Sequence, residues 1–414
     1  MKIKKLIGVM AVAGFVLPGA ALATNGMFSA GYGMKAKGMG GAATAMSQDA
    51  FGGATNPASM VFAGDRLDLG VDLFSPRREA SRTGSGSGLN GTVDSDSNYF
   101  LVPEFGYNKM LNVDMSVGVT VYGNGGMNTD YAPLPGLGGA NLLGGNGNLG
   151  VDLMQLIIAP TAAVKIAPNH SVGISPLLGY QRFKAEGLQA FDQSVSSSSA
   201  GNVTNKGYDD AFGYGVRVGY MGKITPTISV GAAYSTKVDM QEFDEYKGLF
   251  AEQGDLDIPE NYNLGVAWQA TPALQFALDY QRINYSGVKS IGNPSTNQTQ
   301  LGSSNGPGFG WKDVDVWKLG AQYQYAKNLV MRAGYNHGDN PIGASDVTLN
   351  ILAPGVIKDH ASLGMTYTTS TGGELTVAYV HAFENSVSGT SSFGGTDTIK
   401  MYQNSLGVSY GWKM

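Results

Sequence analysis

Residues that could perform catalysis or hold a metal are scarce in this chain of 414 residues. The sequence contains no cysteine, which excludes disulfides, thiolate metal ligands and cysteine nucleophiles. Its histidines are His170, His337, His360 and His381. None of them belongs to an H-E-x-x-H zinc motif or lies beside a G-x-S-x-G nucleophile elbow. We therefore expect neither an enzyme nor a metal or cofactor site, and we interpret the histidines as lumen or interface residues of strands.

A leucine-rich stretch, 127–150, is the clearest candidate for binding an apolar molecule. Its leucines are Leu134, Leu137, Leu142, Leu143 and Leu149. Leucines exposed in a loop form an apolar patch, and such a patch usually marks a binding surface. The alternative is that the loop packs its leucines on itself, over the mouth of the fold. The sequence leaves both interpretations open.

The overall composition restricts the class of protein. A net charge of −5 and a charged content of 14% give no reason to expect nucleic-acid binding. Glycine accounts for 61 residues, roughly twice its ordinary share. The chain has 21 Tyr and 16 Phe, yet its mean hydropathy is only −0.08. This combination is typical of strands that alternate between a lipid-facing apolar side and a polar lumen.

The first 23 residues have the pattern of a secretory signal peptide. A cluster of lysines precedes an apolar run from Leu6 to Leu17, and Ala21-Leu22-Ala23 forms a small-residue cleavage site. We expect the mature chain to begin at Thr24. No later segment has the roughly 18 uninterrupted apolar residues that a transmembrane helix needs. The exported chain is therefore either soluble or crosses a membrane as a β-barrel, which also satisfies every backbone polar group in lipid.

From Arg66 onward the chain repeatedly alternates between two kinds of residue with the period of a β-strand. For example, Trp317 and Leu319 alternate with Lys318 and Gly320. One face of each segment is bulky and apolar, and the other is small or polar. In a membrane barrel the bulky residues face outward, because lipid lies outside and the polar lumen lies inside.

We predict an all-β fold, a transmembrane antiparallel barrel of about 14 strands over residues 65–414 with no internal domain boundary. The expected strands are 66–80, 97–108, 112–122, 151–166, 170–186, 207–222, 226–240, 259–269, 273–286, 311–325, 328–337, 357–369, 373–385 and 400–412. Short turns alternate with long connections rich in Gly, Ser, Asn and Asp. The short turns are expected on the periplasmic side and the long loops outside.

The stretch Thr24–Gly64 differs from everything after it because small residues dominate it. Such backbone suits close packing against a surrounding wall. The stretch ends in the turn Asn56-Pro57-Ala58, whose proline cannot donate a ladder hydrogen bond. We predict that residues 24–64 form an N-terminal plug, or hatch, in the lumen, with Asn56, Pro57 and Ala58 against the wall. Apolar residues such as Phe28 and Met34 argue against the alternative, a mobile Gly-rich leader.

Aromatic residues gather near the predicted strand ends, where the interfacial belts of a membrane barrel lie. They are Tyr220, Tyr234, Trp268, Tyr285, Tyr325, Tyr335, Tyr367, Tyr410 and Trp412. A water-soluble β-sandwich with buried aromatics is the alternative. The separation of apolar from polar faces favours the barrel.

Several stretches together resemble the FadL family of outer-membrane long-chain fatty-acid transporters and their relatives that admit aromatic hydrocarbons. These stretches are the signal peptide, the Gly- and Ala-rich segment that closes in Asn56-Pro57-Ala58, the series of strands, LDIPENYNLGVAWQATPALQFALDY at 256–280, and MRAGYNHGDNPI within 315–342. The resemblance covers essentially the whole mature chain. It departs at the end, where outer-membrane proteins usually finish on an aromatic residue and this chain finishes in Trp412-Lys413-Met414.

The resemblance implies passive uptake of a hydrophobic ligand across the outer membrane of a Gram-negative bacterium, without ATP or a TonB partner. The ligand would be held first among the extracellular loops, at the leucines of 127–150, and then in a deeper pocket lined by Phe28 and Met34. It would leave toward the bilayer through a side opening made by a kinked strand near the hatch. If the ligand is a fatty acid, lumen-facing Arg217, Lys318 or Arg332 would meet its carboxylate.

The expected partners are a hydrophobic small molecule, the outer-membrane lipids and the barrel-assembly machinery. We expect a monomer that binds no nucleic acid. The alternative class is a general or aromatic-selective porin-like channel, or a structural outer-membrane protein. The hatch would have no role in either of these.

Overall fold

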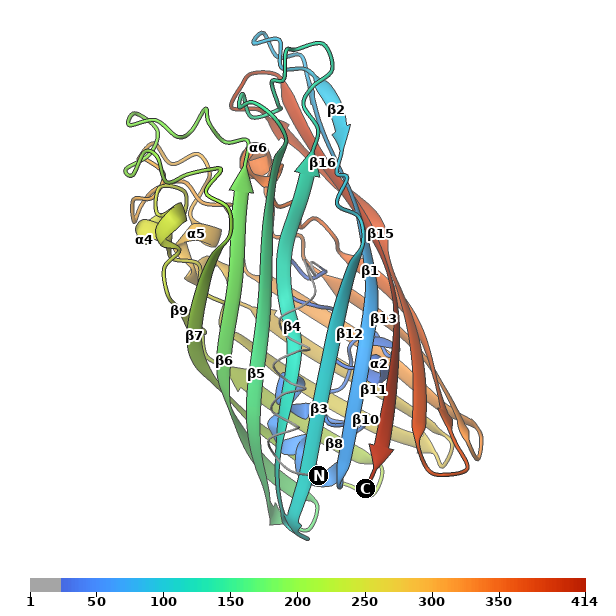
Figure 1. Cartoon of the computed structure of the whole chain (residues 1–414). Coiled ribbons are helices and arrows are strands. Elements are labelled where there is room, and N and C mark those ends of the chain that lie inside the picture. The colour runs from blue at the N-terminus through green and yellow to red at the C-terminus, as the bar shows by residue number, and fades with distance from the viewer. Residues whose placement is uncertain (1–23) are drawn as a thin grey trace.

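The computed structural model describes residues 24–414, so the predicted signal peptide, 1–23, lies outside the described residues. Fourteen long strands form a closed antiparallel barrel, as the alternation predicted (Figure 1). They are β1 (Arg66–Thr83), β3 (Phe100–Asn112), β4 (Met115–Tyr131), β5 (Leu149–Ala167), β6 (His170–Glu186), β7 (Asp209–Lys223), β8 (Ile228–Ser235), β10 (Asn261–Thr271), β11 (Leu274–Ile283), β12 (Val314–Ala326), β13 (Leu329–Gly338), β14 (Asp359–Thr368), β15 (Glu374–Thr390) and β16 (Thr396–Lys413). Pairing of β16 with β1 closes the ring.

Smaller elements lie beside the barrel strands, in the loops and in the N-terminal segment. Strand β2 (Gly91–Asp94) pairs with β1, and β9 (Asp239–Met240) pairs with β7. Single helical turns occur in the N-terminal segment and the loops: α2 (Met34–Lys37), α3 (Gly52–Thr55), η1 (Pro57–Phe62), η2 (Asp244–Tyr246), α4 (Ala251–Gly254), η3 (Tyr285–Gly287), α5 (Lys289–Gly292), η4 (Ala344–Asp346) and α6 (Val347–Asn350). Within residues 24–414 no helix is long and apolar enough to cross a membrane.

The two ends of the barrel differ in their connections. Tight turns such as 113–114 and 168–169 join strands at one end, and long loops such as 284–313 join them at the other. In Figure 1 the long loops gather at the top, and the C-terminus lies at the lower end with the short turns. This is the predicted asymmetry between short turns and long loops.

Side chains on the strands alternate between the outside and the inside of the barrel, as predicted. Trp317 and Leu319 are each 52% exposed, whereas Lys318 between them is 6% exposed. In β13, Met331 is exposed and Arg332 is buried. The large apolar residues therefore point away from the lumen, where lipid would surround the barrel.

Several tyrosines on the outer surface bind an acceptor on a neighbouring strand or its loop. Tyr180 donates to Asp210, Tyr234 to Glu260, and Tyr280 to Asp315, each over 2.7 Å. Such amphipathic rings suit the level of the headgroups. Tyr285 is a correction to the predicted belt, because it lies beyond the end of β11 and is fully buried inside the molecule.

Inward-facing glycines bring the wall close to the N-terminal segment, residues 24–64. At Gly173 an added Cβ would lie 2.5 Å from the carbonyl carbon of Pro57, and at Gly320 it would lie 2.8 Å from the carbonyl oxygen of Met39. The same crowding occurs at Gly106, Gly118, Gly219, Gly231, Gly265, Gly334, Gly364 and Gly407. These ten positions lie on ten different strands. Glycine at these ten positions therefore allows close contact between the wall and this segment.

Candidate functional site

Two cavities lie among inward-facing residues of the barrel. The upper cavity is mostly apolar and is bounded by β1, β4, β16 and the long loops. Its lining residues are Phe74, Pro76, Arg78, Gly126, Met127, Asn128, Trp311, Ala353, Pro354, Gly355 and Met401. A site that is largely apolar with few polar groups is the usual form of a pocket for a small hydrophobic ligand.

The lower cavity lies between the N-terminal segment and the wall and is more polar. The segment contributes Phe28, Gly31, Tyr32, Gly41, Thr44, Ala54 and Thr55, and the wall contributes Arg217, Asn261, Asn263, Gln281 and Lys318. Thus three predicted ligand residues, Phe28, Arg217 and Lys318, meet at one cavity. No local sequence motif predicted that these three residues would lie together.

Aromatic rings connect the two cavities. Trp311 lines the upper cavity, and its ring lies 5.1 Å from the ring of Tyr285. The Tyr285 ring lies 6.1 Å from that of Phe28, which lines the lower cavity. The Tyr285 hydroxyl accepts a hydrogen bond from Met27 N at 2.8 Å and donates to Asn25 O at 2.5 Å. Burial raises the pKa of Tyr285, so this hydroxyl stays protonated and holds the start of the segment.

The barrel wall is incomplete as a hydrogen-bonded sheet between β3 and β4. Their pairing ends at Phe105↔Val121, and above this point the ladder of β3 is with β1 and the ladder of β4 is with β5. Ser95, which precedes β3, bridges Tyr131 at the upper end of β4. A bulge in β4 shifts the register between Gly123 and Gly125. We call this boundary the seam; in Figure 1 the two strands diverge above their lower halves.

The N-terminal segment lies against the inner side of the seam. Phe28 forms an isolated β-bridge with Gly125, just after the bulge. The Tyr32 hydroxyl donates to Asn124 O at 3.1 Å, and its ring lies 4.7 Å from that of Tyr122. Two residues that line the lower cavity therefore also cover the place where the wall is unpaired.

Arg217 and Lys318 are both buried at the lower cavity. Arg217 donates from Nη1 to Gly53 O at 2.8 Å and to the Tyr122 hydroxyl at 3.1 Å, and its Nε has no partner among the described residues. Lys318 faces Asp279 across the β11–β12 ladder. One oxygen of the Asp279 carboxylate accepts backbone N–H bonds from the N-terminal segment. Nε of Arg217 is thus a buried donor with capacity for a further acceptor.

Two predicted ligand residues, Met34 and Arg332, lie outside these two cavities, and their role in ligand binding stays a prediction. Met34, in α2, packs its sulfur against Gly407 of β16, whereas Phe28 contacts β4. Arg332 donates to Gln322 at 3.0 Å and to Thr366 at 2.7 Å. Neither Met34 nor Arg332 lines either cavity.

The predicted turn at the end of the N-terminal segment contacts β6 and β7. Asn56 Nδ2 donates to Tyr220 O at 2.9 Å, and the Ser171 hydroxyl donates to Ala58 O at 2.8 Å. Asn56 also caps η1, since its side chain accepts a bond from Ala58 N. Pro57 begins η1, where its missing N–H costs nothing.

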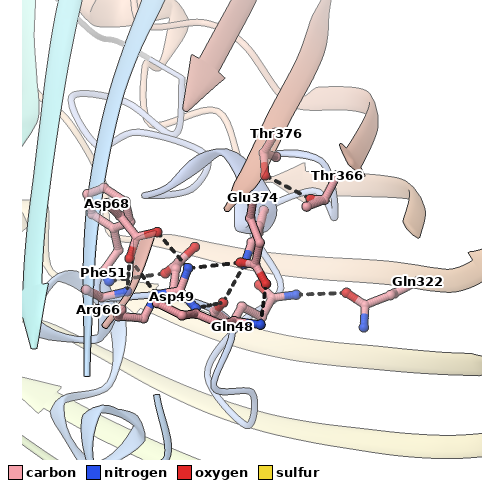
Figure 2. Close-up of polar contacts among 12 residues, drawn as sticks. Gln48, Asp49, Phe51, Arg66, Asp68, Gln322, Thr366, Glu374 and Thr376 are labelled. Atoms are coloured by element: carbon pink, nitrogen blue, oxygen red, sulfur yellow. Dashed lines mark hydrogen bonds and ion pairs between the residues drawn. The ribbon is translucent and has the colours of Figure 1, made fainter. Parts of the chain in front are cut away.

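Buried charges tie the N-terminal segment to the wall (Figure 2). Lys35 Nζ lies 2.6 Å from Glu374 Oε2 of β15, and Arg66 Nη2 lies 3.1 Å from the same oxygen. Arg66 also forms a bidentate pair with Asp68. Next to this group, burial and the carboxylate of Asp68 raise the pKa of Asp49 to about 6.

The leucine-rich stretch 127–150 is not the exposed loop that its composition suggested. β4 continues to Tyr131 and β5 begins at Leu149, so the loop itself is only 132–148. The paired strands extend the barrel upward through residues that looked like loop. The predicted boundaries were therefore too wide.

The leucines of this loop pack on their neighbours. Leu134, Leu142 and Leu143 are at most 2% exposed and belong to the main hydrophobic cluster, whereas Leu137 is 38% exposed. Gly144 lies against the Phe393 ring. Removing apolar area from water drives this packing. The expectation of an exposed leucine surface is wrong for all but Leu137, and the proposed role of these residues in ligand binding stays a prediction.

Sequence reasoning also missed several residues of the upper cavity. Arg78 and Phe74 lie in β1, and Trp311 and Ala353 come from loops far along the chain. The sequence signal that could have identified Arg78 is its place in the middle of a predicted strand, at a position that faces the lumen. Within residues 24–414, no three His, Asp or Glu side chains are grouped to hold a metal.

Comparison with known proteins gives a consistent family and fold. The family model described as outer membrane protein transport protein (OMPP1/FadL/TodX) matches residues 10–409. No curated protein sequence matches the chain. Similar solved structures include the toluene transporter TodX of Pseudomonas putida (TM-score 0.70, 18% identity, 93% of this chain and 99% of that one), a FadL homologue of Pseudomonas aeruginosa (0.72, 16%, 94% and 99%) and the toluene transporter TbuX of Ralstonia pickettii (0.65, 17%, 92% and 98%). At these identities the structures establish similarity of fold.

Proposed function

The chain belongs to the outer membrane protein transport protein family (OMPP1/FadL/TodX), and from this we propose that it is a passive uptake channel for hydrophobic small molecules. Residues 24–64 act as the hatch that gates it. The protein works as a monomer in the outer membrane of a Gram-negative bacterium, after signal-peptide export and insertion by the barrel-assembly machinery. Long-chain fatty acids and related hydrocarbons are the proposed substrates.

One observation carries this proposal: the N-terminal segment covers an unpaired seam in the wall beside a cavity. Phe28 bridges Gly125 at the seam and also lines the lower cavity. A general porin needs an open aqueous lumen and gains nothing from such a cover. An apolar solute, by contrast, avoids hydration if it passes from a cavity directly into lipid.

The proposed path begins at the loops and ends in the bilayer. The ligand enters the apolar upper cavity beside Trp311, and movement of the Tyr285 and Phe28 rings opens the lower cavity. Withdrawal of Phe28 and Tyr32 from β4 then uncovers the seam. The bilayer outside receives the ligand without any energy input, because the transfer is downhill for an apolar molecule.

The lower cavity supports a fatty acid among the proposed substrates. Arg217 and Lys318 place two cations at its wall, and Nε of Arg217 is an unused donor, which suits a carboxylate. Toluene, which TodX and TbuX are described as transporting, would use only the apolar surfaces. Both kinds of substrate fit the same hydrophobic path.

A switchable disulfide tests the gating role of the N-terminal segment. The chain has no native cysteine. The double variant Phe28→Cys, Gly125→Cys therefore contains just two cysteines, at two positions that form a β-bridge. Directly opposed residues of an antiparallel pair lie about 4.5–5.5 Å apart, within disulfide range. We expect oxidation to stop uptake of a radiolabelled long-chain fatty acid into cells and reduction to restore it.

The two single-cysteine variants serve as controls and should respond to neither reagent. Equal uptake by the oxidised and reduced double variant would contradict gating at the seam. Ion conductance in planar bilayers separates the porin alternative, since deletion of residues 24–64 would leave the conductance of a porin nearly unchanged. For a hatch-gated channel we expect the deletion to raise conductance.

A further inference from the structure

Arg78 is a buried guanidinium at the wall of the upper cavity that forms no ion pair with a carboxylate. It is 4% exposed on the inward face of β1. The other buried, inward-facing arginines of β1, Arg66 and Arg82, each bind a carboxylate, at 2.7 and 2.6 Å. Arg78 forms no ion pair with any residue of 24–414. Its hydrogen bonds instead leave Nη2, to the Ser95 hydroxyl at 3.0 Å and to Ser97 O.

The edge of the guanidinium that carries Nη2 also carries Nε, and this second donor remains unsatisfied. Nε of Arg78 is buried and has no hydrogen-bond partner among the described residues. The carboxylates of Asp130 and Asp152 attract Arg78 through space but form no ion pair with it. Asp130 accepts a hydrogen bond from Asn148, and one oxygen of Asp152 accepts a hydrogen bond from Tyr208. A buried charge that forms no ion pair is costly, so its retention calls for a function.

The residues around Arg78 indicate which kind of ligand could bind its free donor. Of the residues that line the upper cavity, Arg78 is the one with a charge, and no acidic side chain lines it. Phe74, Met127 and Trp311 provide apolar surface. Asn128 adds an amide whose oxygen has no partner among residues 24–414. The cavity thus combines one cationic donor with a wall suited to a hydrocarbon chain or ring.

We propose that Arg78 is a specificity-determining residue that binds the carboxylate of an amphiphilic ligand in the upper cavity, while the apolar part of the ligand packs on Phe74, Met127 and Trp311. This inference rests on the proposed uptake function and adds a first point where charge is selected. The ligand carboxylate accepts a charge-assisted hydrogen bond from Nε of Arg78. A neutral ester or hydrocarbon leaves that donor unsatisfied.

Binding measurements in lipid nanodiscs test the assignment, because detergent would compete for an apolar cavity. The probes are hexadecanoate and its methyl ester, each radiolabelled and followed by equilibrium dialysis. The variant is Arg78→Gln. Since a hydrogen bond to a charged group contributes more than a neutral one, we expect hexadecanoate to bind about ten- to a hundredfold more weakly. Binding of the methyl ester should stay within about twofold of the parent protein.

The neighbouring residue offers a matched control. Arg77 faces the outside of the barrel, where it binds the exposed Tyr99 hydroxyl at 2.7 Å. Arg77→Gln should change neither probe. Ser95→Ala removes the loop bond of Arg78 but keeps its charge, so it reports any effect that is merely structural.

Three outcomes decide between the possibilities. Selective loss of hexadecanoate binding in Arg78→Gln alone supports the proposal. Equal loss of both probes, or the same loss in Ser95→Ala, overturns it in favour of a structural role. Failure of the parent protein to bind either probe would refute the proposed uptake function itself, which the other outcomes leave intact.

Discussion

The ammonium group of Lys37 lies 2.7 Å from the Asp72 carboxylate and also 2.9 Å from that of Glu104. Lys37 belongs to the N-terminal segment, whereas Asp72 and Glu104 project from β1 and β3. All three side chains are buried. This contact therefore ties the segment to β3, one of the two seam strands, and to its neighbour β1.

Removal of Lys37 should be far more damaging than removal of an exposed lysine. In Lys37→Met two carboxylates stay buried without their cation, which typically costs about 3–5 kcal/mol. We expect that loss in the free energy of unfolding, measured by urea titration in lipid vesicles. Lys109→Met is the control, because its pair with Asp65 is largely exposed and should contribute no measurable stability. Similar losses in both variants would contradict this account.

Crowding between wall and segment predicts a second effect. At Gly334 an added Cβ would collide with the backbone of Met39 and Gly40. Hydrogen bonds between neighbouring strands hold the wall in place, so Gly334→Leu should displace the N-terminal segment instead of the wall. We expect ion conductance to rise, while the barrel keeps its heat-modifiable migration in electrophoresis. Gly86→Leu is the control, since nothing lies within 4 Å of the added Cβ there. Unchanged conductance in Gly334→Leu would show that the segment does not limit ion flow.

Asp49 predicts a dependence on pH. Its pKa in the folded protein is about 6, above the usual value of about 3.9. The folded state therefore binds this proton more tightly than the unfolded chain, so the stability that it contributes is present at low pH and is lost as pH rises through about 6. Protease sensitivity of residues 24–64 should increase between pH 5 and pH 7. Asp49→Asn should remove the dependence; an identical profile in that variant would assign it to another group.

Variants of the loop leucines can distinguish a role in ligand entry from a role in packing the loop. Leu137→Ser changes the exposed leucine and should leave the loop resistant to proteases while lowering uptake at limiting substrate. Leu143→Ser places a hydroxyl in a buried apolar cluster and should loosen the loop itself, at a cost typical of a large-to-small core change, about 2–5 kcal/mol. Normal uptake in Leu137→Ser would mean that ligand entry does not use this side chain.

The outer face of β12 gives a direct test of membrane placement. Leu319 points outward, so Leu319→Arg should destabilise the barrel by about 2–4 kcal/mol if the residue lies near the midplane. Spin labels at Leu319 and Gln322 provide the independent measurement. We expect label mobility and oxygen accessibility typical of lipid at 319 and a lumen environment at 322, and the reverse pattern would refute this register.

The sequence alone determined the class of fold, because the relevant signal is local. Alternation between residues such as Leu319 and Lys318 is legible over a few positions, and lipid outside with a polar lumen inside permits one orientation. The small residues of 24–64 and the turn Asn56-Pro57-Ala58 likewise marked a segment that packs against a wall.

Only the tertiary structure decided which inward residues meet. Tyr285 binds Met27 across 258 positions of sequence, and Arg78 reaches the same cavity as Trp311. Such contacts depend on the register of all the ladders and on the bulge in β4, and a one-residue slip would turn every side chain to the other face. The same cause explains why Leu143 is buried and why Met34 and Phe28 contact different strands, β16 and β4. These outcomes depend on how distant segments pack together, which the pattern of neighbouring residues does not specify.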